Sequence, residues 1–148
     1  MVSAMDDGVG RVMNAIKSAG QEENTIVVFL SDNGGPVHKN GSKNFPLRGG
    51  KSDLYEGGIR VPFAMQWKGK IKKGMEYNYP VSSMDIMGTI CEIAGVKTKN
   101  KLDGVNLLPF LKTKNKAMPH DVLFWRKWEQ NAMAIRSCLL YTSDAADD

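Results

Sequence analysis

Two short segments carry the residue types that could do chemistry on an anion. Asp32 and Asn33 follow directly on an apolar run, and Lys51 follows Gly49 and Gly50. A carboxylate and an amide supply the oxygen ligands that suit a hard cation such as calcium, whereas zinc would call for histidine or cysteine. A lysine ammonium is a compact positive charge, and glycines let the backbone approach a ligand closely. Together the segments predict a site for a tetrahedral oxyanion beside a metal ion.

Each segment also has a simpler interpretation. Asp-Asn-Gly-Gly at 32–35 is a favourable turn sequence, because Asn-Gly and Gly-Gly are common where φ must be positive. Lys51 on its own would be an exposed loop lysine, as most lysines are. Their occurrence in one stretch, residues 25–63, favours the shared anion site.

The strands that must position these residues follow from the apolar pattern. Residues 25–31 contain an unbroken β-branched and aromatic run, which predicts a central parallel strand covered on both faces. Asp32 and Asn33 then fall at the carboxyl end of that strand, where open α/β sheets bind ligands. Residues 59–67 predict a second strand, in which Pro62 indicates an edge or a bulge.

Helical spacing and turn residues predict the other elements. Residues 2–19 form an apolar face at helical spacing and end at Gly20 as a C-cap. A second helix begins at Ser82 or Ser83 and ends at Gly95. A short helix is expected over 106–111, and a hairpin over 122–125 and 132–135. The residues of the second helix expected to face a core are Met84, Ile86, Met87, Ile90 and Ile93.

These segments resemble the type I, formylglycine-dependent sulfatase family of the alkaline-phosphatase-like superfamily. The resemblance lies in S-D-N-G at 31–34 and in R-G-G-K followed by E-G-G-I-R-V-P at 48–62. AMDDGVGRVMNAIK, PVSSMDIMGTICEIAGV and LDGVNLLPFL look like further landmarks in family order, so it spans about residues 3–137. It implies an α/β fold, a partial alkaline-phosphatase-like sandwich with helices around a mostly parallel sheet. Residues 1–112 would be the C-terminal part of the catalytic domain, and 113–137 the start of a small antiparallel subdomain.

The resemblance also implies roles for individual residues. Asp32 and Asn33 would bind calcium, and Lys51 would be the catalytic residue that binds the sulfate and its ester oxygen. Arg48 would support the sulfate pocket. His38 follows the metal turn, and a substrate contact and a variable loop position describe it equally well. The implied substrate is a sulfate ester, with sulfated carbohydrate among the candidates.

Four other residues are expected to have structural roles. Cys91 lies in TICEIAGV with no Pro-Ser-Arg after it, which indicates a packed thiol rather than a nucleophile. Glu56 and Arg60 are expected to hold their loop together by an ion pair. His120 precedes a predicted strand and is expected to be structural.

Several family landmarks do not occur in this sequence: the Cys-x-Pro-Ser-Arg segment, further metal-binding aspartates, and a Lys and a His. In the family, the Cys of the Cys-x-Pro-Ser-Arg segment is oxidised to the formylglycine nucleophile. This segment is expected upstream, so the chain is expected to be a C-terminal portion of the catalytic domain and to be inactive alone. Two alternatives stay open. A phosphodiesterase or phosphatase of the same superfamily would place a His after the Asp to hold zinc, and a nonenzymatic anion-binding pseudoenzyme would need no nucleophile.

The last segment departs from every earlier pattern. Residues 138–148, CLLYTSDAADD, resemble a translated sequencing-library adapter, so Ser137 is expected to be about the last natural residue and the tail to pack poorly.

Composition restricts the partners. The chain has 20 basic and 16 acidic residues, a net charge of +4, and its lysines crowd into 68–74 and 97–101. Such runs suit sulfated glycans or are simply solvated loops. They lack interleaved aromatic residues, so nucleic acid is not expected as a partner. The sequence contains no apolar run of about 20 residues, so no membrane-spanning segment is expected in it. The resemblance alone implies a periplasmic, secreted or lysosome-like location.

Overall fold

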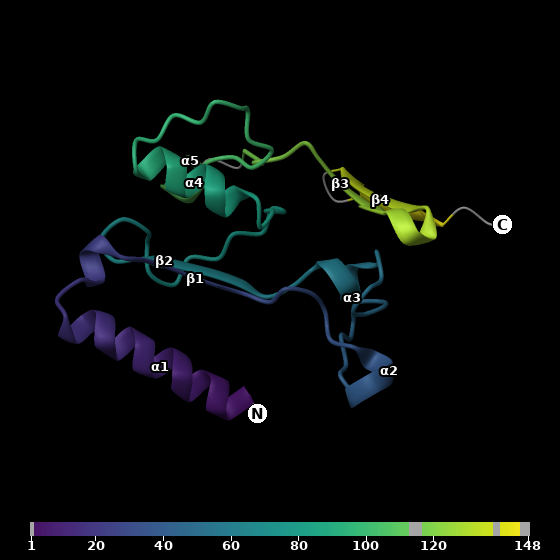
Figure 1. Cartoon of the computed structure of the whole chain (residues 1–148), viewed down its shortest axis with the longest axis horizontal. Coiled ribbons are helices and arrows are strands. Elements are labelled where there is room, and N and C mark those ends of the chain that lie inside the picture. Colours follow the sequence, from purple (N-terminus) through teal and green to yellow (C-terminus); the bar gives the residue numbers. More distant parts are fainter. Residues whose placement is uncertain (1, 113–116, 138–139, 146–148) are drawn as a thin grey trace.

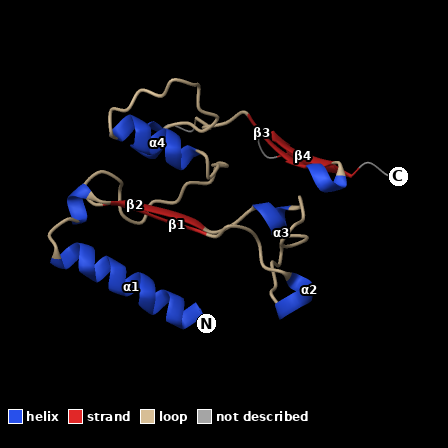
Figure 2. Ribbon diagram, in the orientation of Figure 1, coloured by secondary structure: helices blue, strands red, loops and turns tan. Residues whose placement is uncertain are grey.

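The computed structural model describes residues 2–112, 117–137 and 140–145, the last of these for their backbone alone (Figure 1). Helices and short strands alternate along the chain, which confirms a mixed α/β composition (Figure 2). The elements in order are α1 Val2–Ser18, η1 Glu22–Asn24, β1 Ile26–Leu30, α2 Val37–Asn40, α3 Glu56–Ile59, β2 Phe63–Trp67, α4 Asp85–Ile93, α5 Leu108–Lys112, β3 Val122–Lys127, η2 Trp128–Gln130, β4 Ala132–Ser137 and β5 Leu140–Ala145.

The strand before residues 31–35, named the metal turn after the role predicted for Asp32 and Asn33, is present, but its predicted parallel neighbours are not seen among the described residues. β1 pairs with β2 in an antiparallel two-stranded sheet, with Ile26 opposite Trp67 and Leu30 opposite Phe63. The side chains of β1 are half-buried, apart from Phe29, which is exposed. In the described part of the chain β1 is therefore paired antiparallel and only partly covered, and no parallel sheet is seen there. An apolar run indicates burial but not strand direction. Here residues 31–62 connect the end of β1 to the start of β2 beside it, so the two strands run antiparallel.

The second strand begins later than predicted because a helical turn precedes it. Glu56–Ile59 forms α3, and Pro62 lies just before the first residue of β2. The carbonyl of Pro62 still accepts a hydrogen bond from the Ser31 amide at 3.3 Å. Pro62 thus lies at the end of the strand ladder, where a residue without a backbone N–H can be placed.

The long helices confirm the predicted elements but not all of their predicted faces. Gly20 follows α1 with φ +66°, the left-handed conformation expected of a C-cap glycine. In the view of Figure 1, α1 and α4 lie on opposite sides of the β1–β2 ribbon. Within α4, Ile86 and Ile93 are half-buried as predicted. Three other residues of the predicted core face are not covered by any described segment: Met84, Met87 and Ile90, which are 47%, 58% and 47% exposed.

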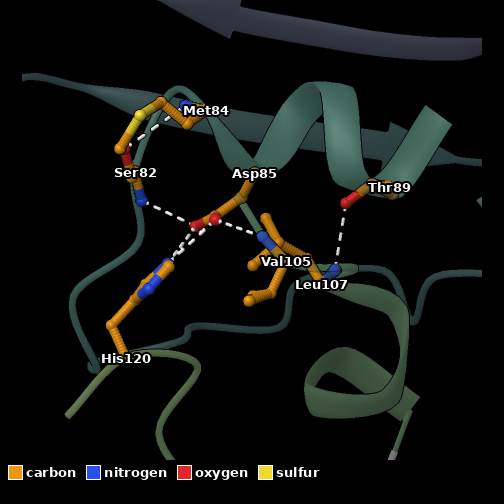
Figure 3. A network of polar contacts seen from close by, with 7 residues as sticks. All are labelled: Ser82, Met84, Asp85, Thr89, Val105, Leu107 and His120. Carbon is orange, nitrogen blue, oxygen red and sulfur yellow. Dashed lines mark hydrogen bonds and ion pairs between the residues drawn. The ribbon is translucent and has the colours of Figure 1, made fainter. Parts of the chain in front are cut away.

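The buried face of α4 is polar and small rather than apolar. Asp85 is fully buried, and its carboxylate accepts hydrogen bonds from the amides of Ser82 and Val105 at 2.7 and 2.9 Å (Figure 3). Nε2 of His120 lies 2.8 and 2.9 Å from the two carboxylate oxygens. This confirms the structural role predicted for His120.

Two further contacts hold α4 to the segment before α5. The Leu107 amide donates to the Thr89 hydroxyl at 3.0 Å, and both residues are almost completely buried. A Cβ on Gly88 would lie 2.8 Å from the carbonyl oxygens of Gly104 and Val105, so the two backbones touch. The hydrophobic core of this region includes Leu107 and Leu108.

The C-terminal segments form the antiparallel sheet β3-β4-β5. The predicted hairpin is confirmed, with Val122 opposite Ser137 and Lys127 opposite Ala132. Its tip is η2, closed by Asn131 with φ 44°. β5 pairs with β4 along its length, from Ser137 opposite Leu140 to Ala132 opposite Ala145. The expectation that the tail makes few specific contacts is therefore wrong for residues 140–145, since an extended backbone can add to an open strand edge whatever its sequence. The rest of the tail, residues 138–139 and 146–148, lies outside the described residues.

In the described part of the chain, no helix combines the length and the apolar character needed to cross a membrane.

Candidate functional site

The metal turn lies where the sequence predicts it, directly after β1. The Ser31 hydroxyl donates to the Asn33 carbonyl at 2.9 Å, which fixes the turn locally. The Asn33 side-chain amide donates to the Gly34 carbonyl at 3.0 Å, so its amide oxygen is the atom left for a cation. Asp32 is exposed, and both side chains border the same open hollow.

The donor set fits a hard cation in kind but not in number. A carboxylate and an amide oxygen are ligands that calcium accepts, whereas calcium takes six to eight oxygens in all. Among the described residues, no group of three or more His, Cys, Asp and Glu side chains could hold a metal. Asp32 and Asn33 would therefore be two ligands of a larger set.

Glycines bring the metal turn against the segment that carries the lysine. The Gly34 amide donates to the Gly58 carbonyl at 2.9 Å across the two segments, and within the lysine segment the Gly57 amide donates to the Arg48 carbonyl at 2.7 Å. A Cβ on Gly34 would lie 1.6 Å from the Gly57 carbonyl oxygen, so no side chain fits there. The glycine-rich spacing noted in the sequence is thus a requirement for backbone contact.

Residues 48–58, the lysine loop, contain a tight turn and are bonded to the metal turn. The Gly50 amide donates to the Asp53 carboxylate at 2.8 Å, and the Asp53 amide donates back to the Gly50 carbonyl at 2.9 Å. Ser52 inside this turn has φ 76°. The Lys51 amide donates to the Gly35 carbonyl at 3.2 Å, which places the lysine backbone beside the residues that follow Asn33. The Lys51 side chain is exposed.

The other predicted substrate residues do not line the hollows that Asp32 and Asn33 border. The Arg48 guanidinium covers the Tyr55 ring at 4.0 Å from its centroid. His38 is exposed on the four-residue helix α2. The two open hollows bordered by Asp32 and Asn33 include neither Arg48 nor His38, and they do not include Lys51.

The predicted loop ion pair is present and is part of a larger contact. Glu56 Oε1 lies 3.6 Å from Arg60 Nη1 and also pairs with Arg136 of β4. Lys127, at the end of β3, donates from Nζ to the Ser52 carbonyl at 2.7 Å. The C-terminal hairpin is therefore attached to the lysine loop at two points. Sequence reasoning missed both, because residues so distant in sequence carry no local signal.

Asn44 is a further residue that sequence reasoning missed. Its side-chain oxygen accepts from the Gly35 amide at 3.0 Å, and its side-chain nitrogen donates to the carbonyls of Gly35 and Gly49 at 3.0 and 2.9 Å. In the sequence it belongs to no motif, so only the fold shows this role.

An oxygen-ligand turn at the end of a strand, bonded through glycines to a lysine loop, defines an α/β protein with a candidate anion site. The chain belongs to the sulfatase family, whose model matches residues 1–96. It is 41% identical over 130 residues to an uncharacterized sulfatase YdeN of Escherichia coli, covering 84% of this chain and 22% of that protein. It is 36% identical over 132 residues to the steryl-sulfatase of Rattus norvegicus, covering 83% of this chain and 23% of that protein.

Solved structures agree in fold. The PsFucS1 sulfatase from Pseudoalteromonas sp. superposes with a TM-score of 0.79 and 33% identity, over 89% of this chain and 27% of that one. A protein described with the metabolism of multiple glycosaminoglycans by Bacteroides thetaiotaomicron gives a TM-score of 0.73 and 26% identity, over 90% and 30%. The chain thus spans about a quarter of the length of the proteins it resembles.

Proposed function

We propose that the full-length protein containing this chain is a sulfuric ester hydrolase of the arylsulfatase-like kind. In this proposal Asp32 and Asn33 are calcium ligands and Lys51 is the catalytic residue that binds the sulfate. The observation that carries it is the hydrogen bond from the Lys51 amide to the Gly35 carbonyl, which joins the lysine loop to the metal turn of a sulfatase-family chain.

The roles follow from charge. The Lys51 ammonium, held beside the ester oxygen, stabilises the negative charge that develops there as the sulfur–oxygen bond breaks, a contribution often worth several kcal/mol. Asp32 and Asn33 offer oxygen atoms to a cation and keep it at the end of β1. Calcium, when bound, supplies positive charge to the sulfate oxygens, and formylglycine, on a segment expected upstream, supplies the nucleophile. We propose that this chain alone hydrolyses no ester.

The substrate class is the least determined part of the proposal. One relative is named steryl-sulfatase, whereas one structural neighbour is described with the metabolism of glycosaminoglycans. The basic segments 68–74 and 97–101 favour a sulfated carbohydrate. Arg48 and His38 are proposed as substrate contacts, and a periplasmic, secreted or lysosome-like location is proposed with them.

The test uses the full-length protein with aryl sulfate hydrolysis and calcium titration measured side by side. Asp32→Ala and Asn33→Ala should weaken calcium binding and lower turnover, because each removes an oxygen ligand. Lys51→Ala should lower turnover while calcium affinity persists, because it leaves the metal ligands intact. Lys43→Ala, which removes an exposed lysine of the same stretch, is the matched control.

The same assay separates the alternatives. Hydrolysis of aryl phosphate in preference to aryl sulfate would favour a phosphatase, and calcium binding with neither activity would favour a pseudoenzyme. Full turnover in Lys51→Ala, or unchanged calcium affinity in Asp32→Ala, would overturn the residue assignment.

A further inference from the structure

One side chain bridges the metal turn and the lysine loop. The Asn44 amide uses both of its polar atoms: the oxygen accepts from the Gly35 amide, and the nitrogen donates to the carbonyls of Gly35 and Gly49. The three distances are 3.0, 3.0 and 2.9 Å. Asn44 is half-buried, so these hydrogen bonds are partly shielded from competition by water.

The bonded groups are the ones that set the distance between the two halves of the site. Gly35 lies two residues after Asn33, and Gly49 lies two residues before Lys51. The Gly35 carbonyl also accepts from the Lys51 amide at 3.2 Å. Asn44 therefore binds both the backbone N–H and the backbone carbonyl of Gly35, and it ties Gly35 to Gly49 at the start of the lysine loop.

The packing leaves little alternative to this link. A Cβ on Gly50 would lie 2.4 Å from the Gly35 carbonyl oxygen and 3.0 Å from the Asn44 side-chain nitrogen. The two backbones and the asparagine amide are thus in direct contact, and a side chain of another shape at position 44 loses at least one hydrogen bond.

We propose that Asn44 is a positioning residue that fixes the separation between the proposed calcium turn and Lys51. It touches neither metal nor substrate and acts through the backbones of Gly35 and Gly49. This inference rests on the proposed function, because the separation matters for activity only if the lysine and the cation act on one sulfate.

A double-mutant cycle in the full-length protein tests the coupling. Asn44→Ala should lower kcat/KM for an aryl sulfate by roughly 10–100-fold at saturating calcium, as expected when a reacting group is misplaced by about 1 Å. Lys51→Ala should cost much less in the Asn44→Ala background than in the wild type, because the lysine is already displaced. Asn100→Ala, at an exposed loop asparagine far along the chain, is the matched control and should change neither value.

A simple loss of stability would give a different result. In that case the effects of Asn44→Ala and Lys51→Ala on kcat/KM would multiply, and this outcome would overturn the proposal. Asn44→Asp adds a second readout. It keeps an acceptor for the Gly35 amide but sets a carboxylate against two carbonyl oxygens, so it should be at least as impaired as Asn44→Ala. If Asn44→Ala does not fold, Asn44→Ser, whose hydroxyl is too short to span both segments, takes its place in the cycle.

A measurement without activity separates this inference from the proposed function. Hydrogen exchange of the Lys51 amide should speed up in Asn44→Ala and stay unchanged in Asn100→Ala, because Asn44 holds the carbonyl that protects it. An inactive wild type with this exchange pattern would sink the proposed function and keep the link between the loops. Unchanged exchange in Asn44→Ala would overturn the inference whatever the activity.

Discussion

Glycine positions decide how closely the metal turn and the lysine loop approach each other. A Cβ on Gly34 would lie 1.6 Å from the Gly57 carbonyl oxygen, and a Cβ on Gly50 would lie 2.4 Å from the Gly35 carbonyl oxygen. Real Cβ atoms do not approach so closely, and the obstacle is backbone rather than a side chain that could rotate away. The glycines of both motifs are therefore needed for packing, whatever the chemistry of their neighbours.

Gly34→Ala should be strongly destabilising for this reason. We expect the loss of unfolding free energy to exceed the roughly 1–3 kcal/mol typical of overpacked sites, because the clash is with backbone. Gly10→Ala is the matched control: Gly10 lies inside α1 with nothing within 4 Å of its Cβ, so alanine should stabilise by about 0.5–1 kcal/mol. Urea unfolding of the full-length protein measures both, and a neutral Gly34→Ala would show that the two segments can separate without cost.

Asp85 offers a second test of a single side chain. Its buried carboxylate accepts from two backbone amides and faces His120 (Figure 3). Asp85→Asn places an amide donor against groups that also donate, so it should cost about 1.5–3 kcal/mol or more of stability. His120→Ala should cost less, because both backbone donors still reach the carboxylate. Thermal unfolding midpoints rank the two, and the reverse order would mean that His120 carries most of the interaction.

Sequence reasoning at the level of single residues worked where the chemistry is local. Asp32 and Asn33 lie after the strand as predicted, and Glu56 pairs with Arg60 one helical turn away. Asn44 and Arg136 could not be found, because their partners lie 5 to 9 and 80 residues away and their roles depend on the fold.

At the scale of elements, the C-terminal hairpin is attached to the lysine loop. The Lys127 ammonium holds the Ser52 carbonyl, and Arg136 pairs with Glu56 of α3. Ser52 follows Lys51 directly and adopts φ 76°, so the hairpin contacts the turn at its most constrained residue. The hairpin and the loop should therefore move together.

Lys127→Met tests this link because it keeps the chain length and removes the donor. One hydrogen bond of this kind is worth about 0.5–1.5 kcal/mol, so we expect kcat/KM for an aryl sulfate to fall by a factor of roughly 2–12. Lys112→Met, at an exposed lysine of α5, should leave it unchanged. An unaltered rate in Lys127→Met would show that the lysine loop keeps its position without the hairpin.

Element types were predictable where periodicity and caps agree. α1 with its glycine cap, α4 and the β3–β4 hairpin all lie close to their predicted ranges. The direction of β1 was not predictable, because an apolar run suits a parallel and an antiparallel strand equally when the residues on both sides are unknown. The start of β2 was missed because Glu56–Ile59 lacks enough residues for a helical period to be visible.

At the scale of the whole molecule, apolar surface is left uncovered on the long helices. Val2, Met5 and Val12 of α1 are 76%, 51% and 59% exposed, and Met87 and Ile90 of α4 are 58% and 47% exposed. The chain covers 22% and 23% of the length of its relatives YdeN and the rat steryl-sulfatase. We infer that further segments of the full-length protein cover these helix faces, since contiguous apolar patches are rarely left in water.

The paired substitution Met87→Lys and Ile90→Lys should therefore have opposite effects in two contexts. In the 148-residue chain expressed alone it should reduce self-association and binding of the dye ANS, because it replaces exposed apolar side chains by charges. In the full-length protein it should destabilise by several kcal/mol, because the same positions would then bury charges without partners. Light scattering of the isolated chain and unfolding of the full-length protein give the two readouts. Lys97→Met, at an exposed residue beyond the end of α4, is the control for changing one charge nearby and should leave the stability of the full-length protein within about 0.5 kcal/mol. If the paired variant is equally harmless in the full-length protein, the outer face of α4 stays in water there, and its apolar residues need another explanation.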